Sequence, residues 1–210
     1  MPEVLKDIDT SLVTVGSPTE GGCAYISFAE NPTMPKDAST KMSTLEGFES
    51  LGEVSEDGFT ESKSVTSNTF KGWHGSTVLT QAQDEDHTFQ IAFLEVSRPA
   101  VAKLRHGVNA VETGEDGSVS HIKPIVGTNI TVSLVIDELE SNGYLRRTII
   151  PKATVNSFDD VSHQRGSLMV YGCTITAIDP GTGSPYEIFR AKPVANISAA
   201  SEQAVSTAKK

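Results

Sequence analysis

The segment Thr88-Phe89-Gln90-Ile91-Ala92-Phe93-Leu94-Glu95-Val96 alternates large apolar side chains with polar or small ones. In an extended strand, successive side chains point to opposite faces, so Phe89, Ile91 and Phe93 share one face and are expected to pack in a core. The same period of two recurs along the chain between turn residues, which is typical of an antiparallel β protein.

The alternation continues in segments on both sides of this strand. Residues 131–137 repeat it. Residues 168–178 are apolar on one face and partly apolar on the other, so this strand is expected to need cover on both sides, from a second sheet or a neighbouring chain. Asn142-Gly143 lies between two expected strands and is the strongest hairpin signal in the chain. The remaining expected strands cover residues 23–29, 44–54, 59–66, 69–80, 118–125, 145–155 and 186–191.

One short helix is expected over residues 98–106. Ser97 can cap it, Pro99 lies in the first turn where its missing N–H costs nothing, and Gly107 can adopt a left-handed exit. The predicted fold is therefore mainly β: an antiparallel β-sandwich or partly closed barrel with one short flanking α-helix, a long inter-strand loop and an extended terminal arm.

Two regions lack periodicity. Residues 31–42 form a long loop between two strands, and long ordered loops are usually functional. Residues 192–210 are rich in Ala, Ser, Thr and Val, so we expect a C-terminal arm that is flexible unless it docks on something. The sequence thus predicts a single β domain over residues 1–191, followed by this arm.

The charge balance excludes some partners. The 17 basic and 27 acidic residues give a formal net charge of -10, which argues against binding nucleic acid through its phosphates and against docking on anionic membranes. Removing residues 192–210 takes away three bases and one acid and leaves -12. Residues 42–62 hold six carboxylates and no Lys or Arg. They are expected to form either an electronegative wall or a generic soluble face.

The apolar runs, the first residues and the cysteines do not indicate a membrane span, a secretory signal or a disulfide framework. The longest apolar runs, such as residues 91–94, are far shorter than the roughly 20 residues of a membrane span. The first residues lack the features of a secretory signal, so we expect a protein made in the cytosol. Cys23 and Cys173 lie far apart in sequence and are expected to be buried apolar residues.

The sequence offers no strong catalytic motif. Asp84, Glu85, Asp86 and His87 could present metal ligands, but a solvated acidic turn leading into a strand is the favoured interpretation. Likewise, Asp137, Glu138 and Glu140 are more plausibly hairpin-end charges than a general-acid pair. We therefore expect no enzyme, no catalytic residue, no metal and no cofactor. The other histidines are isolated in sequence: His74, His106, His121 and His163.

Trp73 stands out because it lies in Gly72-Trp73-His74-Gly75. A lone Trp between glycines can anchor a partner. Burial in its own core is the slightly favoured alternative.

The order of segments resembles the major tail protein, or tail tube protein, of long-tailed non-contractile bacteriophages. The similar features are the turn at residues 55–58, the aromatic Gly72-Trp73-His74-Gly75 motif, a strand that ends in Glu95, and a short helix that closes on Gly107. These features fall within residues 45–110. Outside that region the similarity is one of layout.

The resemblance implies a structural virion protein that self-assembles into stacked, hexameric rings around a channel for genome passage. The expected partners are further copies of the chain, the tape measure protein, the tail terminator and baseplate or tail-tip proteins. Double-stranded DNA would pass without being bound, and no membrane is involved. The location would be the tail of the virion, and the host cytoplasm during assembly.

The resemblance also suggests roles for particular residues. The inter-ring loop would contain Pro32, Pro35, Lys36, Asp37 and Thr40. An acidic channel avoids retarding DNA, because each neutralised phosphate adds affinity; its lumen-facing carboxylates would be Glu46, Glu49, Glu53, Asp137, Glu138 and Glu140. The residues expected to pack or to anchor partners are Trp73, Phe89, Ile91 and Phe93. The alternative is a carbohydrate- or protein-binding β-sandwich, such as an adhesin or decoration protein, with Trp73 and Tyr186 as exposed anchors.

Overall fold

The computed structural model describes residues 8–19, 22–126 and 130–192. In this part of the chain, one α-helix, α1 (Pro99–His106), accompanies three 3-10 turns at Thr10–Leu12, Met42–Thr44 and Val108–Ala110. The strands are β1 (Gly16–Pro18), β2 (Ala24–Ser27), β3 (Glu49–Ser50), β4 (Val54–Lys71), β5 (Thr77–Phe93), β6 (Val111–Thr113), β7 (Val119–Ile122), β8 (Thr131–Glu140), β9 (Leu145–Phe158), β10 (Tyr171–Ala177) and β11 (Glu187–Ala191).

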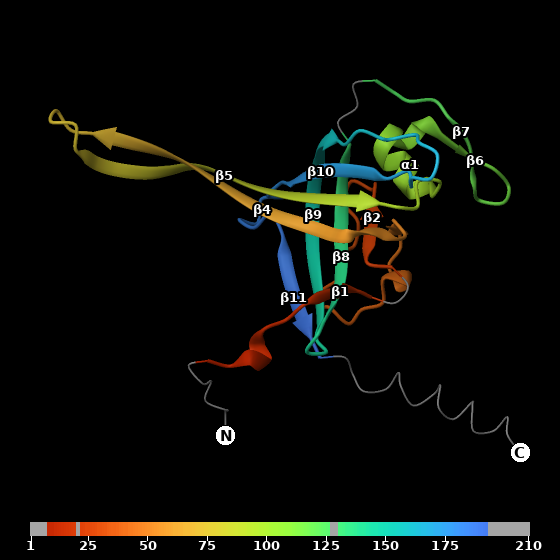
Figure 1. The fold of residues 1–210 in the computed structure, drawn as a ribbon, viewed down its shortest axis with the longest axis horizontal. Helices are drawn as coiled ribbons and strands as arrows, with labels where there is room; N and C mark the ends of the chain where they lie inside the picture. The colour runs from red at the N-terminus through yellow and green to blue at the C-terminus, as the bar shows by residue number, and fades with distance from the viewer. Residues whose placement is uncertain (1–7, 20–21, 127–129, 193–210) are drawn as a thin grey trace, which may run out of the picture.

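The strands form one large antiparallel sheet and one small one (Figure 1). The large sheet has the order β3-β2-β8-β9-β10-β5-β4, while β1 also pairs with β8 and β11 with β9. The small sheet is the β6–β7 hairpin. The mainly antiparallel β fold with one helix is confirmed. The large sheet stays open between β3 and β4, so the fold is not a closed barrel.

The core lies where the sheet folds over itself and meets α1. Phe89, Ile91 and Phe93 of β5 are buried on one face, as the alternation predicts. They join a single apolar cluster with Ile26 of β2 and Ile175 of β10. The strand β10 runs between β9 and β5, with Cys173 and Ile175 buried on one face and Thr174 half-buried on the other. Leu168 and Met169 precede the strand and are exposed, so the described part of the chain does not cover both faces of residues 168–178.

The helix begins one residue later than expected. Arg98, not Ser97, is the N-cap residue, and its carbonyl accepts a hydrogen bond from the Ala102 N–H. Pro99 occupies the first turn, and Gly107 ends the helix with a φ of 108°. Val101 and Leu104 are buried against the sheet. Among the described residues, no helix is both long and apolar enough to span a bilayer.

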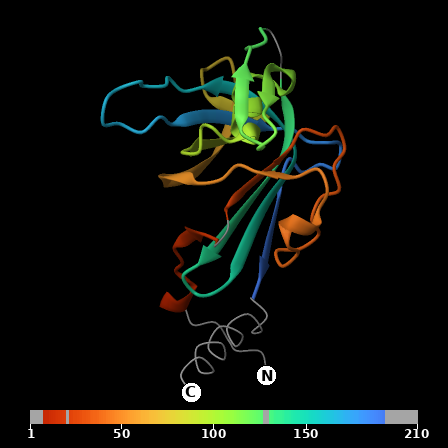
Figure 2. The same ribbon diagram turned by 90° about the vertical axis from the view of Figure 1, so that its right-hand side faces the viewer.

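The Asn142-Gly143 pair forms the turn between β8 and β9, as predicted. Leu139 pairs with Leu145 across the turn, and Gly143 has a φ of 82°. Both strands run the length of the body, from the turn to the end that carries α1 (Figure 1). The loop between β9 and β10 projects at that same end (Figure 2).

Three strand predictions are wrong. Residues 44–54 contain only the two-residue β3 and the start of β4, and the apolar Leu51 there is buried in a non-strand connection. Residues 59–66 and 69–80 are not two separate strands. The strand β4 continues to Lys71, and β5 begins at Thr77 after a turn. The predicted C-terminal arm, apart from Lys192, lies outside the described residues.

Candidate assembly surface

Strands β4 and β5 form a two-stranded arm that projects far from the body (Figure 1). From Thr60 to Asp86 every residue is exposed except the half-buried Gly72. Both faces of this ribbon are therefore open to solvent. The arm therefore gains little stability from burial within its own chain. An isolated two-stranded hairpin is at best marginally stable in water.

The outer half of the arm is almost uncharged and carries exposed apolar side chains among Ser, Thr, Asn and Gln residues. Between Ser64 and Gln83 the only ionisable side chains are Lys71 and His74. Phe70 and Leu79 lie opposite each other across the two strands, and each is about half exposed, at 51% and 54%. Exposed apolar side chains gathered on one element are typical of a surface that another molecule covers.

Trp73 lies in the turn at the tip of the arm and is 100% exposed. The Gly75 N–H donates to the Gly72 carbonyl at 2.8 Å, and the Gly72 N–H donates to the Ser76 carbonyl at 2.8 Å. Gly75 has a φ of 78°, which favours glycine. The favoured expectation that Trp73 packs in its own core is therefore wrong, because the glycines around it form a turn and not a strand.

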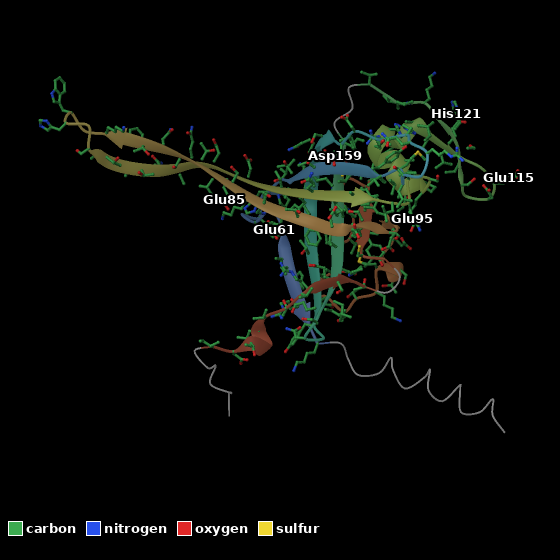
Figure 3. The ribbon with its side chains drawn as sticks, viewed as in Figure 1. Glu61, Glu85, Glu95, Glu115, His121 and Asp159 are labelled. Carbon is green, nitrogen blue, oxygen red and sulfur yellow. The ribbon has the colours of Figure 1, made fainter. Side chains whose placement is uncertain are left out.

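A polar cluster surrounds the root of the arm, where Glu61 and Glu85 lie (Figure 3). The Tyr186 hydroxyl donates to the Glu61 carboxylate, and this bond raises the pKa of Tyr186 to about 12. Tyr186 also contacts the His87 ring in a tilted arrangement, with 5.1 Å between ring centroids, and packs edge-on against Phe89. Tyr186 is thus half-buried at the root, far from an anchor position beside Trp73.

His87 completes this root cluster. Its Nε2 lies 2.8 Å from Glu85 Oε1, while its buried Nδ1 has no hydrogen-bond partner among the described residues. Lys63 Nζ lies 2.6 Å from the same Glu85 oxygen. The root therefore combines polar contacts from both arm strands with an aromatic contact from the segment before β11.

The sequence prediction of a solvated turn at residues 84–87 is wrong, because these residues lie within β5 and His87 is buried. Glu85 and His87 share one face of the strand, since they are two residues apart. In the described part of the chain, no group of three or more His, Cys, Asp and Glu side chains is placed to hold a metal ion.

The proposed inter-ring loop is bonded to its own body. Arg147 Nη1 donates to the carbonyls of Asp37 and Thr40, at 2.9 and 2.8 Å. Pro35 is buried, whereas Pro32 is half-buried and Lys36 exposed. Asp37 Oδ1 accepts hydrogen bonds from the backbone N–H groups and hydroxyls of Ser39 and Thr40, which lowers the pKa of Asp37 to about 2.

Four of the six proposed lumen carboxylates have cationic partners within the chain. Arg147 binds Asp137 with two bonds, at 2.6 and 2.7 Å. Lys103 Nζ lies 2.9 Å from Glu49. These partners neutralise part of the local charge.

The other two pairs lie near the β8–β9 turn. Arg190 donates to the buried Glu140 and lowers the pKa of that carboxyl. Arg146 lies 3.6 Å from Glu138, but burial raises the pKa of Glu138. Glu46 and Glu53 are exposed and make no ion pair among the described residues.

Both cysteines are buried, as expected, and both are free thiols that form no disulfide. Burial raises the pKa of the Cys23 thiol and raises that of Cys173 to about 12. At neutral pH both thiols therefore stay protonated and are poor nucleophiles.

The sequence predicts strands at residues 59–66 and 69–80 but not that this region forms one projecting two-stranded arm. Residues 60–86 lack apolar alternation because neither face of the ribbon is buried, and alternation is the main signal of a strand. Two other features of residues 64–83 could have indicated it: the absence of carboxylates and the Gly-flanked aromatic turn.

Comparison with known proteins gives the family. A family model described as phage tail tube protein matches residues 20–199. The match covers most of the chain, so this protein belongs to the phage tail tube protein family and is a structural protein of the phage tail.

Comparisons with curated proteins and with solved structures add little to the family match. No curated protein matches the chain. A chain in the "Cryo-EM structure of the anti-feeding prophage (AFP) baseplate, 6-fold symmetrised" is similar over 83% of this chain and 97% of its own length. The two are 9% identical, and the TM-score is 0.39.

Proposed function

We propose that this protein is the repeating subunit of the tail tube of a long-tailed, non-contractile phage. It self-assembles into hexameric rings that stack into a hollow channel, through which double-stranded DNA passes without being bound. Its other partners are the tape measure protein, the tail terminator and baseplate or tail-tip proteins. Assembly takes place in the host cytoplasm.

The observation that carries the proposal is the exposed arm. A ribbon that exposes both faces from Thr60 to Asp86 gains stability when neighbouring copies cover it. The strand β4 also lies at the end of the large sheet, so its outer edge can pair with a strand of another chain. Both features are typical of a subunit whose exposed ribbon and free strand edge are covered by other copies on assembly.

The arm supports contact between copies more strongly than the loop at residues 32–40 does. Two carbonyls of that loop accept hydrogen bonds from Arg147, and Pro35 of the loop is buried. In the part of the chain that the structure describes, the arm has no comparable contact beyond its root. We therefore assign the main contact between successive rings to the arm and a secondary one to the exposed side chains of the loop.

The charge of the chain supports a channel that does not retain DNA. A balance of -10 repels phosphates, and a conduit that neutralised them would hold the polymer. Of the proposed lumen set, Glu46 carries charge without an ion-pair partner among the described residues. Glu53 is also unpaired there but lines the groove between β1 and the start of β4. The paired carboxylates contribute less, because their cations offset them.

The test is assembly of the purified protein, compared with a variant in which Asn-Gly replaces residues 66–84. That change joins Val65 to Glu85, which are partners across the arm. Negative-stain microscopy should show tubes of the unaltered protein and, for the shortened variant, single rings at most. An unaltered protein that stays monomeric at high concentration would contradict the proposal.

A further inference from the structure

The body carries a groove whose surface complements the tip of the arm. It lies between β1 and the start of β4 and has a volume of about 470 Å³. Its floor is apolar, with Val54, Phe59, Ile91 and Ile136 among the lining side chains. It is therefore suited to accept an apolar side chain.

The rim of the groove is acidic. Glu53, Glu56 and Asp57 line it and are exposed, and none makes an ion pair within the described residues. Glu138 lines the opposite side, and burial raises the pKa of its carboxyl. A cation that enters this groove would therefore gain several carboxylate contacts and would favour the ionised form of Glu138.

The tip has the matching chemistry. Trp73 is fully exposed, and Lys71 and His74 lie beside it with no carboxylate between Ser64 and Gln83. Trp is among the side chains that most often dominate binding energy at interfaces. An aromatic group flanked by bases fits an apolar floor inside an acidic rim.

We propose that the arm tip of one copy, led by Trp73, docks in the groove between β1 and the start of β4 of a second copy. The inference rests on the self-assembly proposed above and names the surface that receives the arm. Lys71 and His74 then face Glu56 and Asp57 across the contact, and Trp73 covers Phe59.

The arm cannot reach the groove of its own chain. Phe59 lines that groove, and Lys71 lies twelve residues further along the same strand. At about 3.3 Å per residue, the tip lies about 40 Å from its own groove. The receiving groove must therefore belong to another copy, displaced by about that distance.

The geometry of this contact allows unlimited growth. The tip and the groove are different surfaces, so each copy donates one tip and offers one groove. Such head-to-tail contacts do not close between two partners and generate extended assemblies when repeated. A stacked tube needs a contact of this kind.

Two complementary variants test the docking. Trp73→Ala removes the tip anchor but leaves the groove intact. Glu56→Lys with Asp57→Lys reverses the rim but leaves the tip intact. Each variant alone should lose stacking, with contact between copies weakened by roughly 30-fold or more, as for an interface hot spot. An equimolar mixture should give stacks of two rings, because intact tips meet intact grooves once. Sedimentation velocity measures both results.

Matched controls are Leu168→Ala, which truncates an apolar side chain exposed at 75%, and Glu115→Lys, which reverses an exposed charge on the β6–β7 turn (Figure 3). Both should stack as the unaltered protein does. If Trp73→Ala and the rim variant also stack normally, the docking is wrong while the tube proposal stands. If the unaltered protein does not assemble at all, both proposals are wrong.

Cross-linking gives an independent measurement. His74→Cys and Asp57→Cys in one chain keep the Trp73 anchor and, in a Cys23→Ala background that removes the thiol lining the groove, should form disulfides between copies. Cys173 is buried and does not compete. Ladders of cross-linked chains are expected under mild oxidation. Absence of ladders in assembled tubes would contradict the docking, and so would equal ladders from a Leu168→Cys and Asp57→Cys control.

Discussion

Arg147 shows how one side chain can join three parts of the molecule. Its side chain is 4% exposed and holds Asp137 of β8 with two bonds. The same guanidinium donates to the carbonyls of Asp37 and Thr40 in the loop after β2. Arginine presents several donors in a planar fork, so lysine cannot make the same set of contacts.

We expect Arg147→Ala to lower the free energy of unfolding by about 3 kcal/mol or more, because it leaves the Asp137 carboxylate without its cation and frees the loop. Arg147→Lys should recover only part of the loss. Urea denaturation measures the change. The control Lys63→Ala breaks an exposed pair and should cost about 1 kcal/mol or less. Equal losses in the two alanine variants would contradict this account.

Asp37 predicts a dependence of stability on pH. Its pKa is lowered from 3.8 to about 2 by hydrogen bonds from Ser39 and Thr40. Because the folded-state pKa is depressed, the stabilisation is complete well above pH 3.8 and is lost as the pH falls toward 2. The difference in Tm between the unaltered protein and Asp37→Asn should therefore shrink over this window.

Thermal unfolding at pH values from 6 to 2 measures the effect. Asp160→Asn, at another exposed carboxyl, serves as the control and should show no such trend. A difference for Asp37→Asn that stayed constant down to pH 2 would show that these hydrogen bonds do not stabilise the charged form.

Among the elements, strands with one buried face could be predicted and the arm could not. Phe89, Ile91 and Phe93 alternate because one face of β5 enters the core. Further out on the same strand, residues 77–86 are exposed on both faces and show no such pattern. The sequence of that part is consistent with several structures, and only pairing with β4 selects one.

Features that depend on local sequence could also be predicted, whereas contacts between distant residues could not. Asn142-Gly143 and Pro99 act through local backbone geometry, so the hairpin and the helix follow from sequence. The groove and the root of the arm join residues that are far apart in the chain. Tyr186 meets Glu61 across 125 positions. No local pattern predicts such a contact.

The exposure of the arm predicts that it contributes little to the stability of the isolated body. Replacing residues 66–84 by Asn-Gly removes only exposed side chains and keeps the root contacts of Glu61 and Lys63. The Tm of the shortened monomer should therefore stay within about 4 °C of the full-length value, a shift that corresponds to a change of about 1 kcal/mol or less. Calorimetry measures it, and a shortened protein that does not fold would show that the arm supports the body.

For the whole molecule, the net charge of -10 does not show how the charged side chains are distributed and paired. Intrachain partners hold Glu49, Asp137, Glu138 and Glu140, whereas the rim residues Glu56 and Asp57 make no ion pair among the described residues. The long arm, in contrast, carries almost no charge in its outer half. The molecule thus combines an acidic body with a nearly uncharged outer arm that would fit against the body of another copy.

The most direct test of this account is a cryo-EM map of the tubes formed by the purified protein. The account predicts that residues 60–86 of each copy are covered by a neighbouring copy, with Trp73 in the groove beside Phe59. A map in which the arms project freely into solvent, while the tube is held by other surfaces, would contradict it.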